Sequence, residues 1–205
     1  GMALRYRRCS KPIRWSRFTR RISACDAEHV AVSVTVTIPA WVDGVLTPVE
    51  KLEAHLKGLR HKAVSVFVIA GGEVLIQRRA LGKYHTPGLW ANTCCTHPEW
   101  GETAAACAVR RLREELGITA VVPEARGQVE YRAEVGGGMI EHEVVDLFRV
   151  VAVERPALAP DPEEVMAVEW LTRAALEARM AAEPEAFTPW VRIYLAQHGA
   201  TIFDT

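Results

Sequence analysis

Residues 90–98 place a thiol and an imidazole two positions apart, in the order Trp-Ala-Asn-Thr-Cys-Cys-Thr-His-Pro. Alternate residues of an extended chain point to the same side, so Cys95 and His97 share one face while Cys94 points into packing. A single cysteine is more often a core residue than a reactive one. A cysteine and a histidine on one face, beside an amide and a hydroxyl, favour acid–base or metal chemistry instead.

A second segment, residues 140–144, brings two carboxylates onto one face of a predicted strand. Glu141 and Glu143 point the same way and His142 points the opposite way. Two carboxylates on a half-buried face repel each other and lose hydration, and a cation between them relieves both costs. The apolar run that continues to Val153 predicts a central strand, which favours the cation site over a solvated strand face.

Three imidazoles complete a candidate metal site. His55 and His61 flank Lys57-Gly58-Leu59-Arg60, and each alone would be an ordinary histidine. Together with His97, Glu141 and Glu143 they form a set of nitrogen and oxygen donors without thiolate. Such a set suits Mg²⁺ or Mn²⁺, and Zn²⁺ remains possible.

A predicted helix over residues 103–116 carries Arg111 and Glu115 one turn apart on one face. This pair could contact both an anion and the metal ion that accompanies it, and the alternative is a surface ion pair. Arg79 and Lys83 follow a predicted hairpin. With Arg111 they could form a local cationic pocket for a diphosphate, although each alone would more often be a solvated charge.

Strands paired in hairpins and interrupted by helices must position these residues. This order of elements predicts an α+β domain with a mixed sheet. β-Branched runs separated by glycines predict hairpins, and Thr103 and Gly117 are the expected cap and end of the central helix. The predicted strands are residues 63–70, 73–79, 128–135, 139–153 and 165–171, and the predicted helices are residues 49–57, 103–116, 172–182 and 189–197.

Charge is distributed unevenly along the 205 residues, which hold 25 basic and 25 acidic side chains. Residues 1–25 contain eight basic and no acidic residues, so the remainder has a net charge of −8. An acidic body argues against general nucleic-acid binding. Residues 1–35 form a basic N-terminal extension. We expect it to be disordered or to act in organelle targeting, and an RNA-binding or anion-binding role is a further alternative.

The five cysteines and the hydropathy of the chain indicate its compartment. An odd number of cysteines with no regular spacing does not fit a secreted disulfide framework and favours reduced thiols in the cytoplasm. No apolar run is long enough for a membrane helix.

Part of the chain resembles the Nudix box, Gly-x5-Glu-x7-Arg-Glu-U-x-Glu-Glu-x-Gly-U, where U is apolar. The matching residues are Glu102, Arg110, Leu112, Glu114, Glu115, Gly117 and Ile118. Thr96 stands in place of the first glycine, and Arg111 stands in place of a glutamate that holds the catalytic metal in diphosphate hydrolases of this family. The exchange counts against hydrolysis.

These departures resemble the type 1 isopentenyl diphosphate isomerases, which have a Nudix fold and do not hydrolyse. Further matching segments are Lys51-x3-His55, Arg78-Arg79-Ala80-x2-Lys83, Trp90-x-Asn92-x2-Cys95-x-His97-Pro98, Tyr131-Arg132-Ala133, Glu141-x-Glu143 and Phe187-x-Pro189-Trp190. The resemblance covers residues 36–198. It implies a Nudix-like α/β/α sandwich with a mixed sheet, an isomerase domain over residues 36–200, and a Nudix core over about residues 59–193.

The resemblance also implies roles for particular residues. The implied metal ligands are His55, His61, His97, Glu141 and Glu143, with Glu115 helping to hold a second Mg²⁺ that arrives with the diphosphate. The implied acid–base pair is Cys95 and Glu143, with Tyr131 hydrogen-bonded beside Glu143. Arg79, Lys83 and Arg111 would contact the diphosphate and Trp190 the hydrocarbon end. His55 and His61 are six residues apart where the family has about seven, which a loop deletion would explain.

The expected activity is the reversible proton shift between isopentenyl and dimethylallyl diphosphate. The expected partners are this small substrate and no nucleic acid, and the expected assembly is a monomer or a weak homodimer. A Nudix pyrophosphohydrolase acting on a nucleoside diphosphate derivative is the enzymatic alternative. A metal-dependent binding module that has lost catalysis is the alternative from another class.

Overall fold

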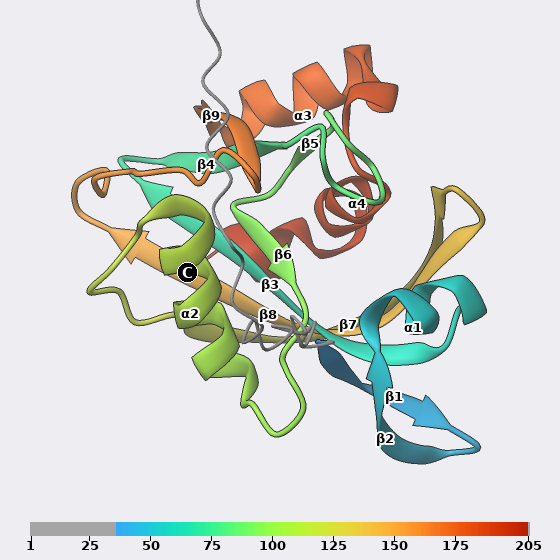
Figure 1. The fold of residues 1–205 in the computed structure, drawn as a ribbon. Coiled ribbons are helices and arrows are strands. Elements are labelled where there is room, and N and C mark those ends of the chain that lie inside the picture. Colours follow the sequence, from blue (N-terminus) through green and yellow to red (C-terminus); the bar gives the residue numbers. More distant parts are fainter. Residues whose placement is uncertain (1–35, 205) are drawn as a thin grey trace, which may run out of the picture. The chain divides into compact units, whose positions relative to one another are not determined.

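Strand β3 (Arg60–Ala70) is the centre of the sheet in the computed structural model, which describes residues 36–204 (Figure 1). Along its whole length β3 pairs in parallel with β8 (Met139–Ala152). On its other side it pairs antiparallel first with β6 (Cys94–Thr96) and then, at its end, with β4 (Glu73–Arg79). The pairing of β7 (Glu124–Gly136) with β8 extends the sheet. The fold is therefore α+β with a mixed sheet, as predicted.

The remaining elements extend or cover this sheet. A hairpin of β1 (Thr37–Val42) and β2 (Val45–Glu50) contacts β3 through Ala40 and His61, and β9 (Val165–Thr172) pairs with β4. The last strand, β5 (Trp90–Ala91), also pairs with β4. The helices are α1 (Lys51–Lys57), α2 (Ala104–Leu116), α3 (Arg173–Ala182), the 3₁₀ turn η1 (Pro184–Ala186) and α4 (Pro189–Phe203).

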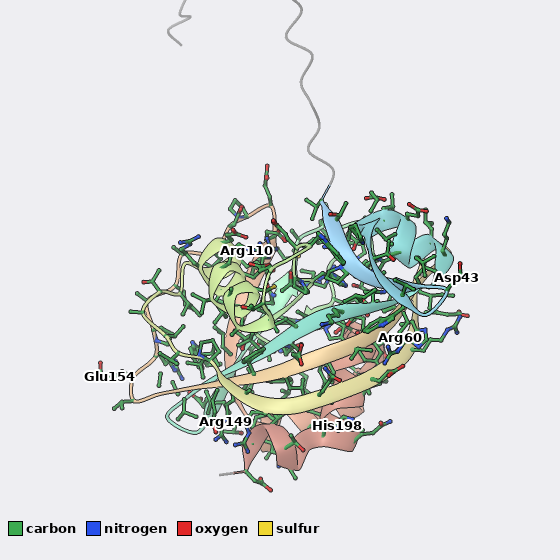
Figure 2. All side chains as sticks on the ribbon, turned by 90° about the horizontal axis from the view of Figure 1, so that it is seen from below. Asp43, Arg60, Arg110, Arg149, Glu154 and His198 are labelled. Carbon is green, nitrogen blue, oxygen red and sulfur yellow. The ribbon has the colours of Figure 1, made fainter. Side chains whose placement is uncertain are left out.

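Side-chain alternation along β3 divides the core into two layers. Val64, Val66 and Val68 pack on the face covered by α2, in one cluster with Leu112. Phe67, one position out of step, packs in the cluster that contains the α4 side chains. Figure 2 shows Arg110 on α2 and His198 on α4 on opposite sides of the sheet. The sandwich of helices around a sheet follows from this period of two.

Helix α2 begins and ends where its sequence predicts. The Thr103 hydroxyl accepts a hydrogen bond of 3.2 Å from the backbone N–H of Ala106. Gly117 follows with φ +69°, a left-handed conformation that costs glycine little. The caps determine where α2 begins and ends. The burial of Leu112 and Leu116 in the core determines its rotation, and with it the side of α2 on which Arg111 and Glu115 lie.

Other predicted boundaries were wrong at the ends of the elements. The first helix begins at Lys51 and not at residue 49, because residues 49 and 50 belong to β2 and the Glu50 carboxylate caps the helix. Strands β3 and β7 start at Arg60 and Glu124, earlier than predicted. Helix α4 continues to Phe203, where the prediction ended it at residue 197, because Ile202 is buried in the core.

The expectations about the basic extension fall on residues 1–35, which lie outside the described residues. In residues 36–204, none of the helices has the length and apolar character that a membrane crossing requires.

Candidate active site

Strand pairing places one histidine, one glutamate and one tyrosine in a row across three strands. His61 of β3 lies opposite Glu143 of β8, and Glu143 lies opposite Tyr131 of β7. Two residues earlier on β8, Glu141 points to the same face, whereas His142 faces outward and contacts Glu130. Glu141 and Glu143 are 2% and 1% exposed, so two carboxylates lie buried side by side as the spacing predicted.

Three buried imidazoles converge on the Glu143 carboxylate. His55 of α1, His61 and His97, which follows β6, join Glu143 in a group whose potential ligand atoms all lie within 4.8 Å of one another. The Nε2 of His97 lies 2.9 Å from Glu143 Oε1, and that of His61 lies 3.7 Å from the same oxygen. The parallel pairing of β3 with β8 and the return of the chain through β6 bring these distant residues together.

Backbone contacts fix which nitrogen of each ring faces the group. His55 Nδ1 lies 2.6 Å from the Lys51 carbonyl oxygen, and His61 Nδ1 lies 2.7 Å from that of Leu59. Each Nδ1 can donate only when it carries the proton, which leaves the Nε2 lone pair free. Both Nε2 atoms are buried without a hydrogen-bond partner among the described residues. Buried orphan nitrogens of this kind fit a metal ion, because it would supply the missing partner.

Burial favours the neutral form of His55 and His97, the form in which an imidazole binds a metal ion. Burial, and then the nearby His61, lower the pKa of His55 to about 4. Burial also lowers the pKa of His97 well below its usual value. The group of His55, His61, His97 and Glu143 therefore has the buried donor atoms of a site that could hold a divalent metal ion.

Tyr131 joins the two carboxylates. Its hydroxyl lies 2.8 Å from Glu141 Oε2 and 2.7 Å from Glu143 Oε2. Burial and the Glu143 charge raise the pKa of Glu141, so this carboxyl tends to keep a proton. Burial would also raise the pKa of Glu143, but His61 and His97 outweigh it and lower that pKa. The two neighbouring carboxyl groups thus have opposite protonation tendencies.

Cys95 is half-buried on β6 and lines the same pocket as Glu143. Its Sγ lies 4.0 Å from the hydroxyl of Tyr194 on α4. Burial, and then the charges of Glu143 and Glu141, raise the pKa of the Cys95 thiol, so it stays protonated. The adjacent Cys94 is fully buried in the opposite core layer, as the alternation predicted.

Four cationic side chains line another wall of this pocket: Lys51, Arg79, Lys83 and Arg111. Burial lowers the pKa of Lys83 to about 8. The guanidinium of Arg111 contacts Glu115 Oε1 at 2.7 Å and Glu164 Oε1 at 3.1 Å. Gln77 donates a 2.9 Å hydrogen bond to the other Glu115 oxygen, which ties α2 to β4 at the pocket. An acidic body therefore holds a local cluster of positive charge.

Trp190, at the first turn of α4, forms an aromatic part of the pocket lining. It is 1% exposed, and the Arg79 guanidinium carbon lies 5.3 Å from its ring centre. The structure thus gathers the predicted site residues at one place. Cys95, His97, Glu141, Glu143, Arg79, Lys83, Arg111, Glu115 and Trp190 line the pocket directly, and His55, His61 and Tyr131 support it from behind.

The sequence reasoning gave no role to three residues that line the pocket, Lys51, Tyr84 and His85, or to Tyr194, whose hydroxyl lies beside Cys95. Lys51 lies one helical turn before His55, and Tyr194 one turn after Trp190, so helical spacing could have indicated both. Tyr84 and His85 lie in the irregular segment after β4, where no periodicity could have found them.

Two residues of the Nudix-box pattern have a structural role outside the pocket. Arg110 donates two hydrogen bonds of 2.7 Å to the Glu102 carboxylate and so joins the start of α2 to its middle. This bidentate pair lowers the pKa of Glu102. Within the Nudix-box segment, Glu102 and Arg110 thus stabilise helix α2, whereas Arg111 and Glu115 line the pocket.

A protein-family model and several sequence relatives match most of the chain. The model of the NUDIX domain matches residues 59–191. A protein of Cereibacter sphaeroides named isopentenyl-diphosphate Delta-isomerase is 67% identical over 166 residues, which are 81% of this chain and 94% of that protein. Proteins of the same name in Dinoroseobacter shibae and Roseobacter denitrificans are 64% and 62% identical, over 82% and 83% of this chain and 96% and 97% of their own lengths.

Solved structures with low sequence identity share the fold. A protein of Deinococcus radiodurans superimposes with a TM-score of 0.63 at 17% identity, covering 79% of this chain and 99% of its own. A MutT protein of Methanosarcina mazei gives 0.53 at 20% identity, covering 67% and 91%. Fold, family model and long relatives of high identity together show that the chain belongs to the isopentenyl-diphosphate Delta-isomerase family of Nudix-fold proteins.

Proposed function

We propose that the protein interconverts isopentenyl diphosphate and dimethylallyl diphosphate, a step of isoprenoid biosynthesis, by moving one proton. The observation that carries this proposal is that the Cys95 thiol and the Glu143 carboxylate open onto one pocket with a cationic and an aromatic wall. The names of the relatives support the same reaction.

The reaction needs two proton-transferring groups at one small alkene. An unactivated alkene is a very weak base, and its protonation gives a tertiary carbocation. A proton must then leave from another carbon, so an acid and a base must both reach the substrate. Cys95 on β6 and Glu143 on β8 lie on strands to either side of β3, and both face the pocket.

The pKa directions give this pair one proton at rest. Cys95 holds it, because burial raises the pKa of the thiol, and Glu143 is ionised. In one direction of the reaction Cys95 gives a proton and Glu143 with Tyr131 accepts one, and in the other direction the roles exchange. A pair with one acid and one base is what a reversible shift requires.

Trp190 stabilises the carbocation in this proposal. A desolvated cation–π contact contributes about 2 kcal/mol, a small part of the roughly 8–23 kcal/mol by which enzymes lower barriers. Positioning and the exclusion of water, which would convert the cation to an alcohol, must supply the rest. The nearly complete burial of Trp190, Tyr131 and Tyr194 supports such a dry hydrocarbon end.

The diphosphate is the handle by which the substrate is held, and no P–O bond breaks. Arg79, Lys83 and Arg111 bind its oxygens, and Lys51, which lies among them, adds a fourth cation. The pKa of Lys83 is lowered in the free protein. A bound diphosphate would raise this pKa again and so keep the Lys83 amine positively charged.

The histidine–glutamate group, defined as His55, His61, His97, Glu141 and Glu143, holds Mn²⁺ or Mg²⁺ in this proposal, with Zn²⁺ as a further candidate. Such an ion would fix the orientation of Glu143 and add positive charge beside the pocket. Glu115 would help to hold a second Mg²⁺ that enters with the diphosphate. We place the enzyme in the cytoplasm, which the three free cysteines among the described residues support, and propose a monomer or weak homodimer.

Incubation of the purified protein with Mg²⁺ and isopentenyl diphosphate tests the proposal. We expect the allylic isomer and no released phosphate. Phosphate release would identify a hydrolase, and an unchanged substrate a binding module. Cys95→Ala should lose at least about 100-fold in kcat, with unchanged thermal unfolding and metal content. Cys94→Ala is the matched control, since the side chain of Cys94 lies in the other core layer. Normal turnover of Cys95→Ala would refute the role of this thiol.

A further inference from the structure

His85 is a buried imidazole beside the histidine–glutamate group, and no role has been assigned to it above. It follows β4, is 5% exposed and lines the pocket. Its Nε2 lies 3.5 Å from Glu141 Oε1, and its ring stacks on that of His55 with 5.5 Å between centres. His55, His85 and Glu141 form a second group of potential ligands whose atoms all lie within 4.8 Å of one another.

The orientation of the ring aims a lone pair at a carboxylate. His85 Nδ1 lies 3.1 Å from the Thr86 hydroxyl oxygen. When Nδ1 donates to this oxygen, Nε2 is the acceptor atom. The lone pair of Nε2 then faces Glu141 Oε1. Either the proton that Glu141 tends to keep or a metal ion that displaces this proton can lie between the two atoms. Ligands bonded to one ion at about 2.0–2.2 Å are at most about 4.4 Å apart, and the 3.5 Å separation lies within that limit.

The two groups of potential ligands cannot hold two ions at once through His55. Its Nδ1 faces the Lys51 carbonyl oxygen, so only Nε2 is available. One imidazole nitrogen has one lone pair and binds one ion. The groups of His55, His61, His97 and Glu143 and of His55, His85 and Glu141 can therefore be filled together only by one ion that lies between them.

We propose that His85 Nε2 is a further ligand of the ion held by the histidine–glutamate group, bound beside Glu141. The inference rests on the proposed metal site and is independent of the isomerase chemistry. A fourth imidazole raises the share of nitrogen donors, which favours later transition-metal ions such as Co²⁺ or Zn²⁺ over Mg²⁺. The backbone supports the position of this ligand, because Arg79 Nη2 donates a 3.1 Å hydrogen bond to the His85 carbonyl oxygen.

Metal binding by the full-length protein tests the proposal without recourse to activity. Mn²⁺ affinity is measured by equilibrium dialysis, and the ligand field is followed by the visible absorption spectrum of the Co²⁺ form. His85→Asn keeps a donor toward Thr86 but removes the atom at the Nε2 position. We expect a loss of at least about 10-fold in Mn²⁺ affinity, the minimum for residues that merely orient a ligand, together with a changed Co²⁺ spectrum. His85→Gln, with an amide oxygen near the Nε2 position, should recover part of the affinity.

The matched control is His198→Ala near the end of α4, a histidine that belongs to neither group of potential ligands and does not line the pocket. It should bind both ions like the wild type. Thermal unfolding in chelator establishes that each variant is folded. An unchanged affinity in both His85 variants would overturn the proposal. A weakened affinity with an unchanged Co²⁺ spectrum would also overturn it, because His85 would then only orient Glu141. Failure of the wild type to bind either ion would refute the metal site itself.

Discussion

Arg111 is the residue at which this protein departs from a hydrolase of the same fold. Its guanidinium contacts Glu115 and Glu164 and points into the pocket, at the position where the Nudix-box pattern has a glutamate. In the proposed function, a cation at this position would attract the diphosphate and would leave one carboxylate fewer for a metal ion that activates water. An arginine in place of a glutamate reverses the charge at this position, which fits a reaction in which no P–O bond of the substrate breaks.

The lowered pKa of Lys83 predicts a pH dependence of substrate binding. In the free protein this pKa is about 8 because the side chain is buried. Above that pH the amine loses its charge and its attraction to the diphosphate. We therefore expect kcat/KM, which reports groups of the free enzyme, to decline as the pH rises through 8, with kcat less affected. Steady-state kinetics between pH 6 and 10 measure this decline.

Lys83→Arg is the control for the pH dependence, because arginine keeps its charge throughout this range. The midpoint of the decline should move to higher pH in this variant. A decline that stays at the same pH would assign it to another group. Lys51, whose pKa is also lowered by burial and by neighbouring arginines, would be the next candidate.

At the scale of elements, the sequence predicted the strands and helices whose buried residues recur at a regular spacing. The alternation on β3 and the caps of α2 gave these elements correctly, because both signals are local. The β1–β2 hairpin was missed although Asp43-Gly44, with φ of 51° and 78°, is a frequent hairpin turn. Pro39 and Pro48 lie opposite each other in this hairpin and hide the strand pattern.

Residue spacing predicted pairs of site residues on one face, but it did not predict how these pairs come together in one site. Residues two apart on a strand gave Cys95 with His97 and Glu141 with Glu143. Their convergence on His61 depends on the parallel register of β3 and β8, which no spacing reveals. The resemblance to a family supplied that step. His85 belongs to no periodic element, so only the folded structure shows it beside Glu141.

The end of α2 predicts a stability effect that reaches the pocket. A Cβ at Gly117 would lie 2.7 Å from Ala159 Cβ and 3.0 Å from the Ala159 backbone nitrogen, and φ is +69°. Gly117→Ala therefore combines backbone strain with a clash, and we expect it to lower the free energy of unfolding by about 2–4 kcal/mol. Chemical denaturation measures this loss.

Gly71→Ala is the matched control for this prediction. It has a similar φ of +58° in the turn between β3 and β4, with nothing within 4 Å of the added Cβ. Strain alone should cost it about 1 kcal/mol. Equal losses in the two variants would contradict a clash at Ala159. Because Glu115 lies two residues before Gly117, a larger KM in Gly117→Ala would show that the position of α2 matters to the pocket.

At the scale of the whole molecule, the charge distribution favours a small anion over a polyanion. Residues 36–205 hold 17 basic and 23 acidic side chains. The positive charge that lines the pocket is therefore surrounded by a net negative body. A nucleic acid would be repelled by that body, whereas a short diphosphate contacts only the local cations. The charge distribution of the chain thus favours the binding of a short anion over that of a long polyanion.

The proposed metal site joins parts of the chain that are far apart in the sequence, so metal binding should stabilise the whole fold. His55, His61, His97 and Glu143 come from α1, β3, the segment after β6 and β8. An ion that binds only the folded protein adds about 2.7 kcal/mol at a free concentration 100 times its Kd. We expect Mn²⁺ to raise the unfolding temperature of the chelator-treated protein in differential scanning calorimetry. The rise should shrink on acidification, because protons compete for the imidazoles. His61→Ala should show little of it and His142→Ala all of it, since His142 points away from the site. An equal rise in both variants would place the ion elsewhere.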